Sequence, residues 1–380
     1  MFNQMRQRGI CLAAVAIALM LAPASTTLFG QTADLDDSAP TGPGLNSCGT
    51  LLTPEQAEVA AYLESIGTYD PPAGLPRFLM QVPVTIHIVR LDNGTGGLTS
   101  QQADDALAAA NALWEPAGLQ FFRPLSVRFI NNTSLFNVDN EAELVALWST
   151  DVIQDSVNVY FVNQLASFDG GSFCGIASFS YVPVQGIAVA NGCTPSGGNT
   201  TTFAHELGHY FDLYHTHETA VGVECPDGSN CATAGDLVCD TPADPNLAGA
   251  GQLSGCSYSG SGTACGDPYN PDTRNVMSYA GACRSQFSYL QAVRAATTLF
   301  NVRTNLVIAG GNPTVTWVEF GAPAGGNGTH GNPYNSLAEG VAHVAPGGRV
   351  VIKRGSSGET ITLTEPVTLD AFQGSAVIGS

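Results

Sequence analysis

Short runs of alternating apolar and polar residues begin at residue 82 and are separated by longer patterns with helical spacing. Residues 82–91 place Val84, Ile86 and Ile88 on one face of a strand, because successive side chains of a strand point to opposite sides. Further strands are predicted at 119–130, 157–162, 175–182 and 186–190, and helices at 99–115 and 140–149. The simplest assembly of these elements is a twisted sheet backed by two helices.

The pattern before residue 82 is different. Residues 25–47 are small and polar, whereas residues 51–66 show helical periodicity after a Thr53-Pro54 start. Prolines then interrupt the chain between residues 71 and 76. We therefore expect residues 25–80 to form a propeptide-like segment that is separate from the sheet.

After residue 190 the pattern predicts two more helices with a long irregular region between them. The helix at 199–213 begins at Asn199 and a run of threonines, which are good capping residues. Residues 216–283 are rich in Gly, Asp and Cys, and the second helix follows at 287–304. Because a loop of this length is rarely stable alone, we expect disulfides or a metal to hold it.

The last region, residues 309–380, is rich in Gly and is expected to form a small all-β module. Its β-like runs are 314–320, 349–353, 360–363, 367–369 and 377–378. Residues 330–353 and 362–380 resemble the opening turns of a right-handed parallel β-helix.

The first 24 residues have the pattern of a secretory signal peptide. Arg6 and Arg8 precede an apolar run at 10–21, and Ala22-Pro23-Ala24 supplies the small residues of a cleavage site. The alternative is a membrane anchor, but a spanning helix needs roughly 20 apolar residues. We therefore predict export of a secreted protein without a membrane anchor.

The chain is strongly acidic. Its net charge of −19 becomes −21 when the signal peptide leaves, because residues 1–24 contain two Arg and no acid. This charge would repel nucleic acid and anionic membranes, so neither is expected as a partner. Surplus carboxylates suit calcium, although solubility alone is an equally simple explanation.

Four of the seven histidines lie within residues 204–217, AHELGHYFDLYHTH. His205 and His209 are four residues apart, so a helix places both on one face, where they can bind one metal ion. Zinc binds imidazole nitrogens, and a catalytic zinc keeps one position for water, whose pKa falls towards about 7. Glu206 stands beside them and is predicted to take the proton of that water and pass it to the leaving amine.

His215 is predicted as the third zinc ligand, because a chain that leaves the helix after His209 can return to the metal from below. A downstream glutamate is the alternative third ligand, but neither Glu218 nor Glu224 has the spacing that a second helix requires. His217 is expected to support the site from the adjoining loop rather than bind the metal.

These segments resemble the pappalysin (cytophagalysin) branch of the metzincin peptidases. The likeness runs through HELGHYFDLYHTH, GDLVCDTPADP at 235–245 and NVMSYAGACRSQFSYLQ at 275–291, and spans about residues 80–305. It implies an α+β, metzincin-like catalytic domain at 81–308. This domain would have a twisted mixed sheet, an active-site helix and a disulfide-rich C-terminal subdomain.

The resemblance also suggests roles for three residues around the site. Met277 would be the Met-turn residue beneath the imidazoles, although ordinary core packing would bury it equally. Tyr279 resembles the family tyrosine that swings to the metal or stabilises the oxyanion. Asp212 stands where the family usually has Gly in a turn, and Asp tolerates the left-handed backbone that such a turn requires.

The cysteines point to four disulfides and one free thiol. Ten are present, Cys11 leaves with the signal peptide, and nine is an odd number in an oxidising compartment. Cys48 in SCGT resembles the thiol of a propeptide that blocks the zinc, and a disulfide or a Cys-linked dimer is the alternative. Cys174 and Cys193 flank a strand pair and are expected to bridge. The likeness pairs Cys256 with Cys283, Cys265 with Cys225 or Cys231, and the remaining one of those two with Cys239.

Asp236, Asp240 and Thr241 resemble a calcium loop of the family, with turn-forming Asp residues as the alternative. The leading functional hypothesis is a secreted zinc metalloendopeptidase that cleaves protein or peptide substrates bound along residues 175–182. An adhesive or binding protein with a vestigial protease domain is the alternative, and the C-terminal module motivates it.

Overall fold

The computed structural model describes residues 48–71, 79–166, 171–249, 251–306, 315–326, 333–344, 348–364 and 366–379. The predicted signal peptide at 1–24 lies outside these residues. Within them, no helix combines the length and the apolar character that a bilayer crossing needs. The described part of the propeptide-like region, residues 48–71, is called the leader segment below.

The central sheet is built around strand β1, which is buried along nearly its whole length. The strands follow the order β2-β1-β5-β9-β8, and β3 pairs with the other half of β1. Their bounds are β1 Met80–Arg90, β2 Leu119–Phe122, β3 Arg128–Asn131, β5 Val157–Val162, β8 Gly175–Ala177 and β9 Ile187–Ala190. All pairings are parallel except that of β8 with β9, so the sheet is mixed and β8 forms an antiparallel edge.

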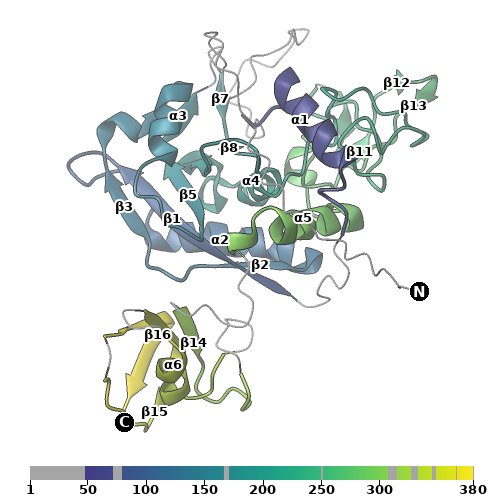
Figure 1. The fold of residues 1–380 in the computed structure, drawn as a ribbon. Helices are drawn as coiled ribbons and strands as arrows, with labels where there is room; N and C mark the ends of the chain where they lie inside the picture. Colours follow the sequence, from purple (N-terminus) through teal and green to yellow (C-terminus); the bar gives the residue numbers. More distant parts are fainter. Residues whose placement is uncertain are drawn as a thin grey trace, which may run out of the picture.

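Helices cover both faces of this sheet (Figure 1). Helix α2 (Ser100–Trp114) and helix α4 (Thr202–Tyr210) pack with Val84, Ile86 and Ile88, as the alternation predicts. Helix α3 (Glu141–Trp148) packs on the opposite face against Val89 and its neighbours. The two helices predicted at 99–115 and 140–149 therefore lie on opposite faces of the sheet.

The strand predicted at 119–130 is wrong as a single element, because β2 and β3 are separate strands. Pro124 lies between them and has no N–H to donate to a ladder. β2 pairs with the first part of β1 from Met80, and β3 pairs with its last part up to Arg90.

A small three-stranded sheet stands beside the central one. Its order is β4-β6-β7, with β4 at Asn137–Val138, β6 at Gln164–Ala166 and β7 at Ser172–Phe173.

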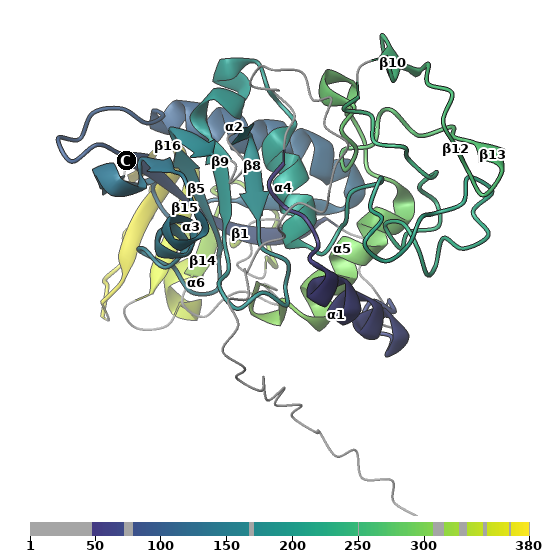
Figure 2. The ribbon, with the colours of Figure 1, turned by 90° about the horizontal axis from the view of Figure 1, so that it is seen from above.

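The disulfide-rich region after α4 contains only very short strands. They form two hairpins, β10 Leu253–Ser254 with β11 Ser257–Tyr258, and β12 Thr263–Ala264 with β13 Asp267–Pro268. Helix α5 (Tyr289–Asn301) then returns to the body, and α1 (Pro54–Ser65) of the leader segment lies alongside it (Figure 2). The capping boxes of α1 and α5 begin at Thr53 and Ser288.

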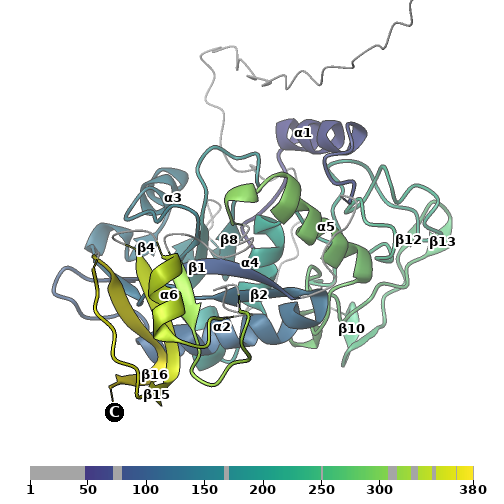
Figure 3. The same cartoon turned by 60° about the horizontal axis from the view of Figure 1, so that its bottom comes forward.

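The C-terminal module has a parallel sheet, as a β-helix opening would, but it is not all-β. Its strands β14 (Val315–Val318), β15 (Arg349–Ser357) and β16 (Thr368–Ile378) carry helix α6 (Leu337–His343) on one side (Figure 3). The helix begins because the Ser336 side chain accepts a hydrogen bond from the backbone N–H of Glu339. Trp317 of the module contacts Phe122 of β2 at a ring-centroid distance of 5.1 Å, which joins the module to the central sheet.

Candidate metal centre and active site

Helix α4 carries the histidine pair beneath the edge of the sheet. All nine residues of α4 are buried, and Asn199 accepts hydrogen bonds from the backbone N–H groups of Thr201 and Thr202 at its start. The helix ends at Tyr210, and Asp212 then adopts the left-handed conformation with φ of 60°. This turn sends the chain back so that His215 faces the helix, as the sequence predicted.

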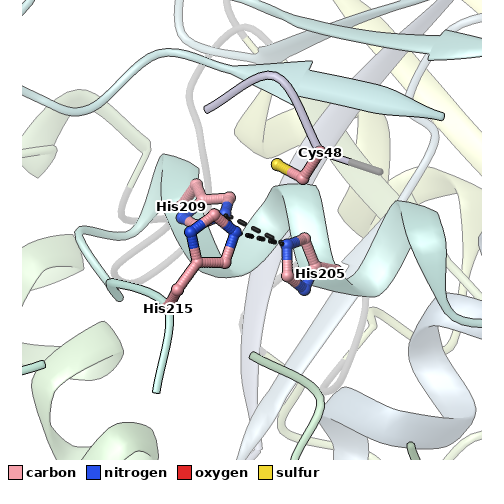
Figure 4. A group of neighbouring side chains, drawn as sticks. All are labelled: Cys48, His205, His209 and His215. Carbon is pink, nitrogen blue, oxygen red and sulfur yellow. Dashed lines mark hydrogen bonds between the residues drawn. The ribbon is translucent and has the colours of Figure 1, made fainter. Parts of the chain in front are cut away.

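Three imidazole nitrogens converge at one point (Figure 4). The Nε2 atoms of His205, His209 and His215 lie 3.1–3.2 Å from one another. Four ligand atoms placed tetrahedrally around zinc at 2.0–2.1 Å would lie about 3.3 Å apart. The spacing therefore matches three corners of a zinc coordination tetrahedron.

The protonation of these rings supports a cation between them. The Nδ1 atom of His205 lies 2.7 Å from the Val276 carbonyl, and that of His209 lies 2.8 Å from the Leu213 carbonyl. A carbonyl only accepts, so each Nδ1 carries the hydrogen and each Nε2 presents a lone pair. Lone pairs that face one another in a buried site repel unless a cation sits among them, so the donor set fits zinc.

Cys48 of the leader segment completes the same cluster. Its Sγ and the three imidazole nitrogens all lie within 4.8 Å of one another, and all four residues are buried. In Figure 4 the Cys48 side chain reaches the imidazoles from the segment that runs above helix α4. Of the cysteines that the structure describes, Cys48 alone is free. The geometry allows it to be a fourth ligand.

Glu206 lies directly beside this fourth corner. Its Oε2 atom is 3.6 Å from Cys48 Sγ and 3.4 Å from Thr50 Oγ1, and the residue is 1% exposed. A Cβ atom at Gly175 of β8 would come within 2.5 Å of its carboxylate. Glycine at 175 therefore leaves the space that the Glu206 side chain occupies.

Burial dominates the electrostatics of the cluster. It lowers the pKa of His209 to about 3 and the pKa values of His205 and His215 well below their usual range. These rings are therefore neutral, which is the form that binds a metal. Burial raises the pKa of Glu206 to about 8, and burial followed by the charge of Glu206 raises the pKa of Cys48.

Met277 is fully buried and packs against residues of helix α4. A Cβ atom at Gly208 would lie 2.4 Å from its Sδ atom, so glycine is what allows the close contact. The backbone N–H of Met277 donates to Asn275 Oδ1 at 2.8 Å, which fixes the turn. That the Met277 side chain forms a floor under the imidazoles stays a prediction.

Tyr279 lies between the metal cluster and the leader segment. Its hydroxyl donates to the Cys48 carbonyl oxygen at 3.2 Å, and its ring centroid is 4.8 Å from that of His215. The His217 ring stacks on that of His215 at a centroid distance of 4.8 Å and makes a tilted contact with the Tyr279 ring at 4.4 Å. His217 thus supports the cluster from beside it.

Besides Cys48, the described part of the chain holds eight cysteines, which form four disulfides. Cys174 bridges to Cys193 and Cys256 to Cys283, the pairs that the sequence analysis gave. For the two options left open, the structure pairs Cys225 with Cys265 and Cys231 with Cys239. Three of the four bridges lie in the poorly periodic region, which they hold together as expected.

The proposed calcium residues are not all in one place. Asp236 is 1% exposed and accepts a hydrogen bond from Thr241 Oγ1 at 2.9 Å. Asp240 instead accepts from Ser288 Oγ at 2.6 Å and from the backbone of Leu290 at 2.8 Å, at the start of α5. Glu224 is also buried, and burial followed by the charge of Glu224 raises the pKa of Asp236.

Sequence reasoning missed two groups of polar residues around the site. Thr50 binds the backbone of Ala177 through its hydroxyl, and its place two residues after Cys48 was a signal. Arg284 is 5% exposed, donates to Thr201 Oγ1 at 2.7 Å and lies 3.3 Å from His205 Nδ1. Nothing local in the sequence marks Arg284, because its partners come from α4.

Comparison with known proteins identifies this arrangement. The family model of peptidase M43, described as pregnancy-associated plasma protein-A, matches residues 153–299, which contain all three histidines and Met277. These residues form a pappalysin-type metallopeptidase domain.

Relatives of this pappalysin domain are named extracellular metalloproteases, and the alignments cover most of the length of each relative. An extracellular metalloprotease of Verticillium alfalfae is 29% identical over 273 residues, 68% of this chain and 91% of the relative. One from Colletotrichum graminicola is 29% identical over 229 residues, 56% of this chain and 74% of the relative. A solved structure of a promirolysin mutant from Tannerella forsythia has 17% identity and a TM-score of 0.51. It covers 69% of this chain and 97% of that one, and shares the fold. The chain is accordingly a secreted zinc metallopeptidase.

Proposed function

We propose that this peptidase is an endopeptidase in which His205, His209 and His215 hold zinc and Glu206 moves the proton. The observation that carries the proposal is the convergence of three Nε2 atoms at 3.1–3.2 Å with the Glu206 carboxylate next to the fourth corner. When bound, zinc supplies a Lewis acid that polarises a water and the scissile carbonyl.

The residues of the chain have distinct roles in this proposal. Glu206 takes a proton from the attacking water and delivers it to the nitrogen of the leaving amine. Its position supports this role, because the Glu206 carboxylate lies 3.6 Å from Cys48 Sγ, which stands beside the three imidazoles. The Tyr279 hydroxyl, once it leaves the Cys48 carbonyl, donates a hydrogen bond to the developing oxyanion.

We propose that the substrate binds as an extra strand along β8. This strand is the outermost strand of the central sheet on that side and lies against α4. The leader segment already uses that edge: the Gly49 N–H donates to the Gly175 carbonyl at 2.9 Å, and Cys48 pairs with Gly175 in parallel. A substrate would add antiparallel to β8, in the direction opposite to the leader.

The intact chain is proposed to be latent. Cys48 Sγ stands at the fourth corner of the metal cluster, where a thiolate would exclude water from zinc. In this proposal the chain consists of a signal peptide at 1–24, a propeptide at 25–80, a catalytic domain at 81–308 and the C-terminal module at 309–380.

Calcium is proposed to bind near Asp236. The carboxylates of Asp236 and Glu224 are both buried, and Glu224 Oε2 has no hydrogen-bond partner among the described residues. Two buried carboxylates whose charges act on each other are costly without a cation, and oxygen ligands suit calcium.

Hydrolysis of a casein or fluorogenic peptide substrate tests the proposed function. We expect the activated chain to cleave it, to lose activity with a zinc chelator and to regain activity when zinc is restored. Elemental analysis should find one zinc per chain. Protein that binds zinc yet cleaves nothing would instead favour the binding or adhesive role.

A further inference from the structure

Arg294 on helix α5 is a buried cation between two tyrosines. Its side chain is 6% exposed, and its guanidinium lies 4.0 Å above the ring of Tyr69 and 5.1 Å from the ring of Tyr214. Its Nε atom donates to the backbone carbonyl of Asp212 at 2.8 Å. The Asp212 carboxylate itself is turned to the backbone and hydroxyl of Ser180.

The carboxylate that pairs with Arg294 comes from the leader segment. Nη1 donates to Glu64 on α1, while the buried Nη2 atom has no hydrogen-bond partner among the described residues. Asn301 of α5 also donates to the Thr68 carbonyl oxygen, so the end of the leader segment is held along the same helix. Loss of the leader would remove Glu64 and Tyr69 together, and the guanidinium would keep its contacts with the Tyr214 ring and the Asp212 carbonyl but lack an ionic partner.

Ring contacts connect this cation to the metal cluster. Tyr214 immediately precedes the ligand His215, and its ring centroid lies 5.2 Å from that of Phe179. The Phe179 ring in turn lies 5.6 Å from the ring of His209. Because Phe179 follows β8 in the chain, the guanidinium lies towards the C-terminal end of the strand that we assign to substrate binding.

The surface between these points is apolar and is covered by the leader. Leu52 and Ala60 pack there against Phe179, Val182 and Tyr214. Without the leader, this surface would form a groove with apolar walls and one cation at its end. A guanidinium beside apolar side chains and without an ionic partner is costly, and its planar donors match the two oxygens of a carboxylate.

We infer that Arg294 is the specificity-determining residue of a substrate subsite for the carboxylate of a Glu or Asp side chain, which Glu64 fills until the leader is removed. An antiparallel substrate has its N-terminal half towards the C-terminal end of β8. The acidic residue therefore lies on the N-terminal side of the scissile bond. This inference rests on the proposed function and names the substrate class of the same site.

A proteome-derived peptide library, cut by the activated zinc-loaded chain, tests the subsite. We expect Glu and Asp to be enriched over Gln and Asn by about 10-fold at one position N-terminal to the cut. Arg294→Gln should abolish the enrichment, and Arg294→Lys should keep part of it. Arg274→Gln is the matched control, because it removes the same charge from a side chain that is 63% exposed. Each ratio is measured within one enzyme, so a loss of folded protein cancels.

Hydrogen exchange of α1 in the intact zinc-loaded chain provides a readout that needs no hydrolysis. Glu64→Gln and Arg294→Gln should each speed exchange of residues 54–65 by about 10-fold, and the double variant no further. Cleavage without acidic preference, or a preference that survives Arg294→Gln, overturns the inference and leaves the proposed function intact. If no peptide is cut but the exchange rates are coupled, the hydrolytic function fails and Arg294 remains a carboxylate-binding residue. Additive exchange effects contradict the pairing itself.

Discussion

Gly175 and Glu206 are in such close contact that the strand at the sheet edge and the histidine helix share one small space. A Cβ atom built on Gly175 would lie 2.5 Å from the Glu206 carboxylate. Real Cβ atoms do not approach other atoms so closely. The Glu206 carboxylate can therefore occupy this position only because residue 175 has no side chain.

Gly175→Ala is expected to lower kcat by about 100-fold while zinc stays bound, because a displacement of about 1 Å at a reacting group costs this much. The measurement is peptide hydrolysis by the activated chain together with elemental analysis for zinc. Gly192→Ala is the control, since a Cβ atom there meets nothing within 4 Å. Equal activity of the two variants would show that the contact does not position the carboxylate.

Glu206→Ala is expected to lower kcat by at least about 10³-fold, the range for loss of a general acid–base group. Zinc content should be unchanged, because His205 and His209 keep their Nδ1 hydrogen bonds and the three imidazoles keep their spacing. Hydrolysis of a fluorogenic peptide and metal analysis on the same sample check both parts. Full activity in this variant would remove Glu206 from the mechanism.

Cys48→Ala is expected to raise the residual activity of the intact, uncleaved chain only partly. The fourth corner of the cluster is then open to water, but the backbone of the leader still lies along β8 and still accepts the Tyr279 hydrogen bond. Glu58→Ala, at an exposed position on α1, is the control and should leave the chain latent. The peptide hydrolysis rate is measured with the leader still attached. A thiol reagent adds a check in the parent chain: it should modify Cys48 readily only after a chelator has removed the zinc.

Calcium removal is expected to lower the melting temperature of the parent chain, because buried Asp236 and Glu224 then repel each other. Binding at a hundred times the dissociation constant contributes about 2.7 kcal/mol. Asp236→Asn should abolish the response to added calcium, whereas Asp227→Asn, at an exposed loop position, should keep it. Thermal unfolding with and without a calcium chelator measures the shift. A shift of equal size in the Asp236 variant would place calcium elsewhere.

The parts of the molecule that the sequence predicted are those governed by short spacing. His205 and His209 share a face because a helix repeats within four residues, and β1 alternates because a strand repeats every two. The strand predicted at 119–130 failed where one residue, Pro124, interrupts an otherwise suitable pattern. The helix at 337–343 was missed because the apolar runs around it suggested strands.

Contacts between parts of the chain that are far apart in sequence could not be predicted from short spacing. Tyr69 donates to the Asp212 carboxylate across 143 residues, and Glu64 meets Arg294 across 230. The departure from glycine at 212 was visible in the sequence, and the left-handed backbone there was expected. That its carboxylate would tie Ser180 to the leader segment depends on how the leader packs, which no local pattern encodes.

The hydrogen bond from Tyr279 to the Cys48 carbonyl has a consequence for how the enzyme is switched on. In the proposed latent form, Cys48 blocks the fourth corner through its sulfur, and its backbone carbonyl accepts the hydrogen bond of the Tyr279 hydroxyl. Withdrawal of that residue therefore frees the two groups in the same event. Onset of activity should be all-or-none in each molecule, with no half-competent species accumulating on the way.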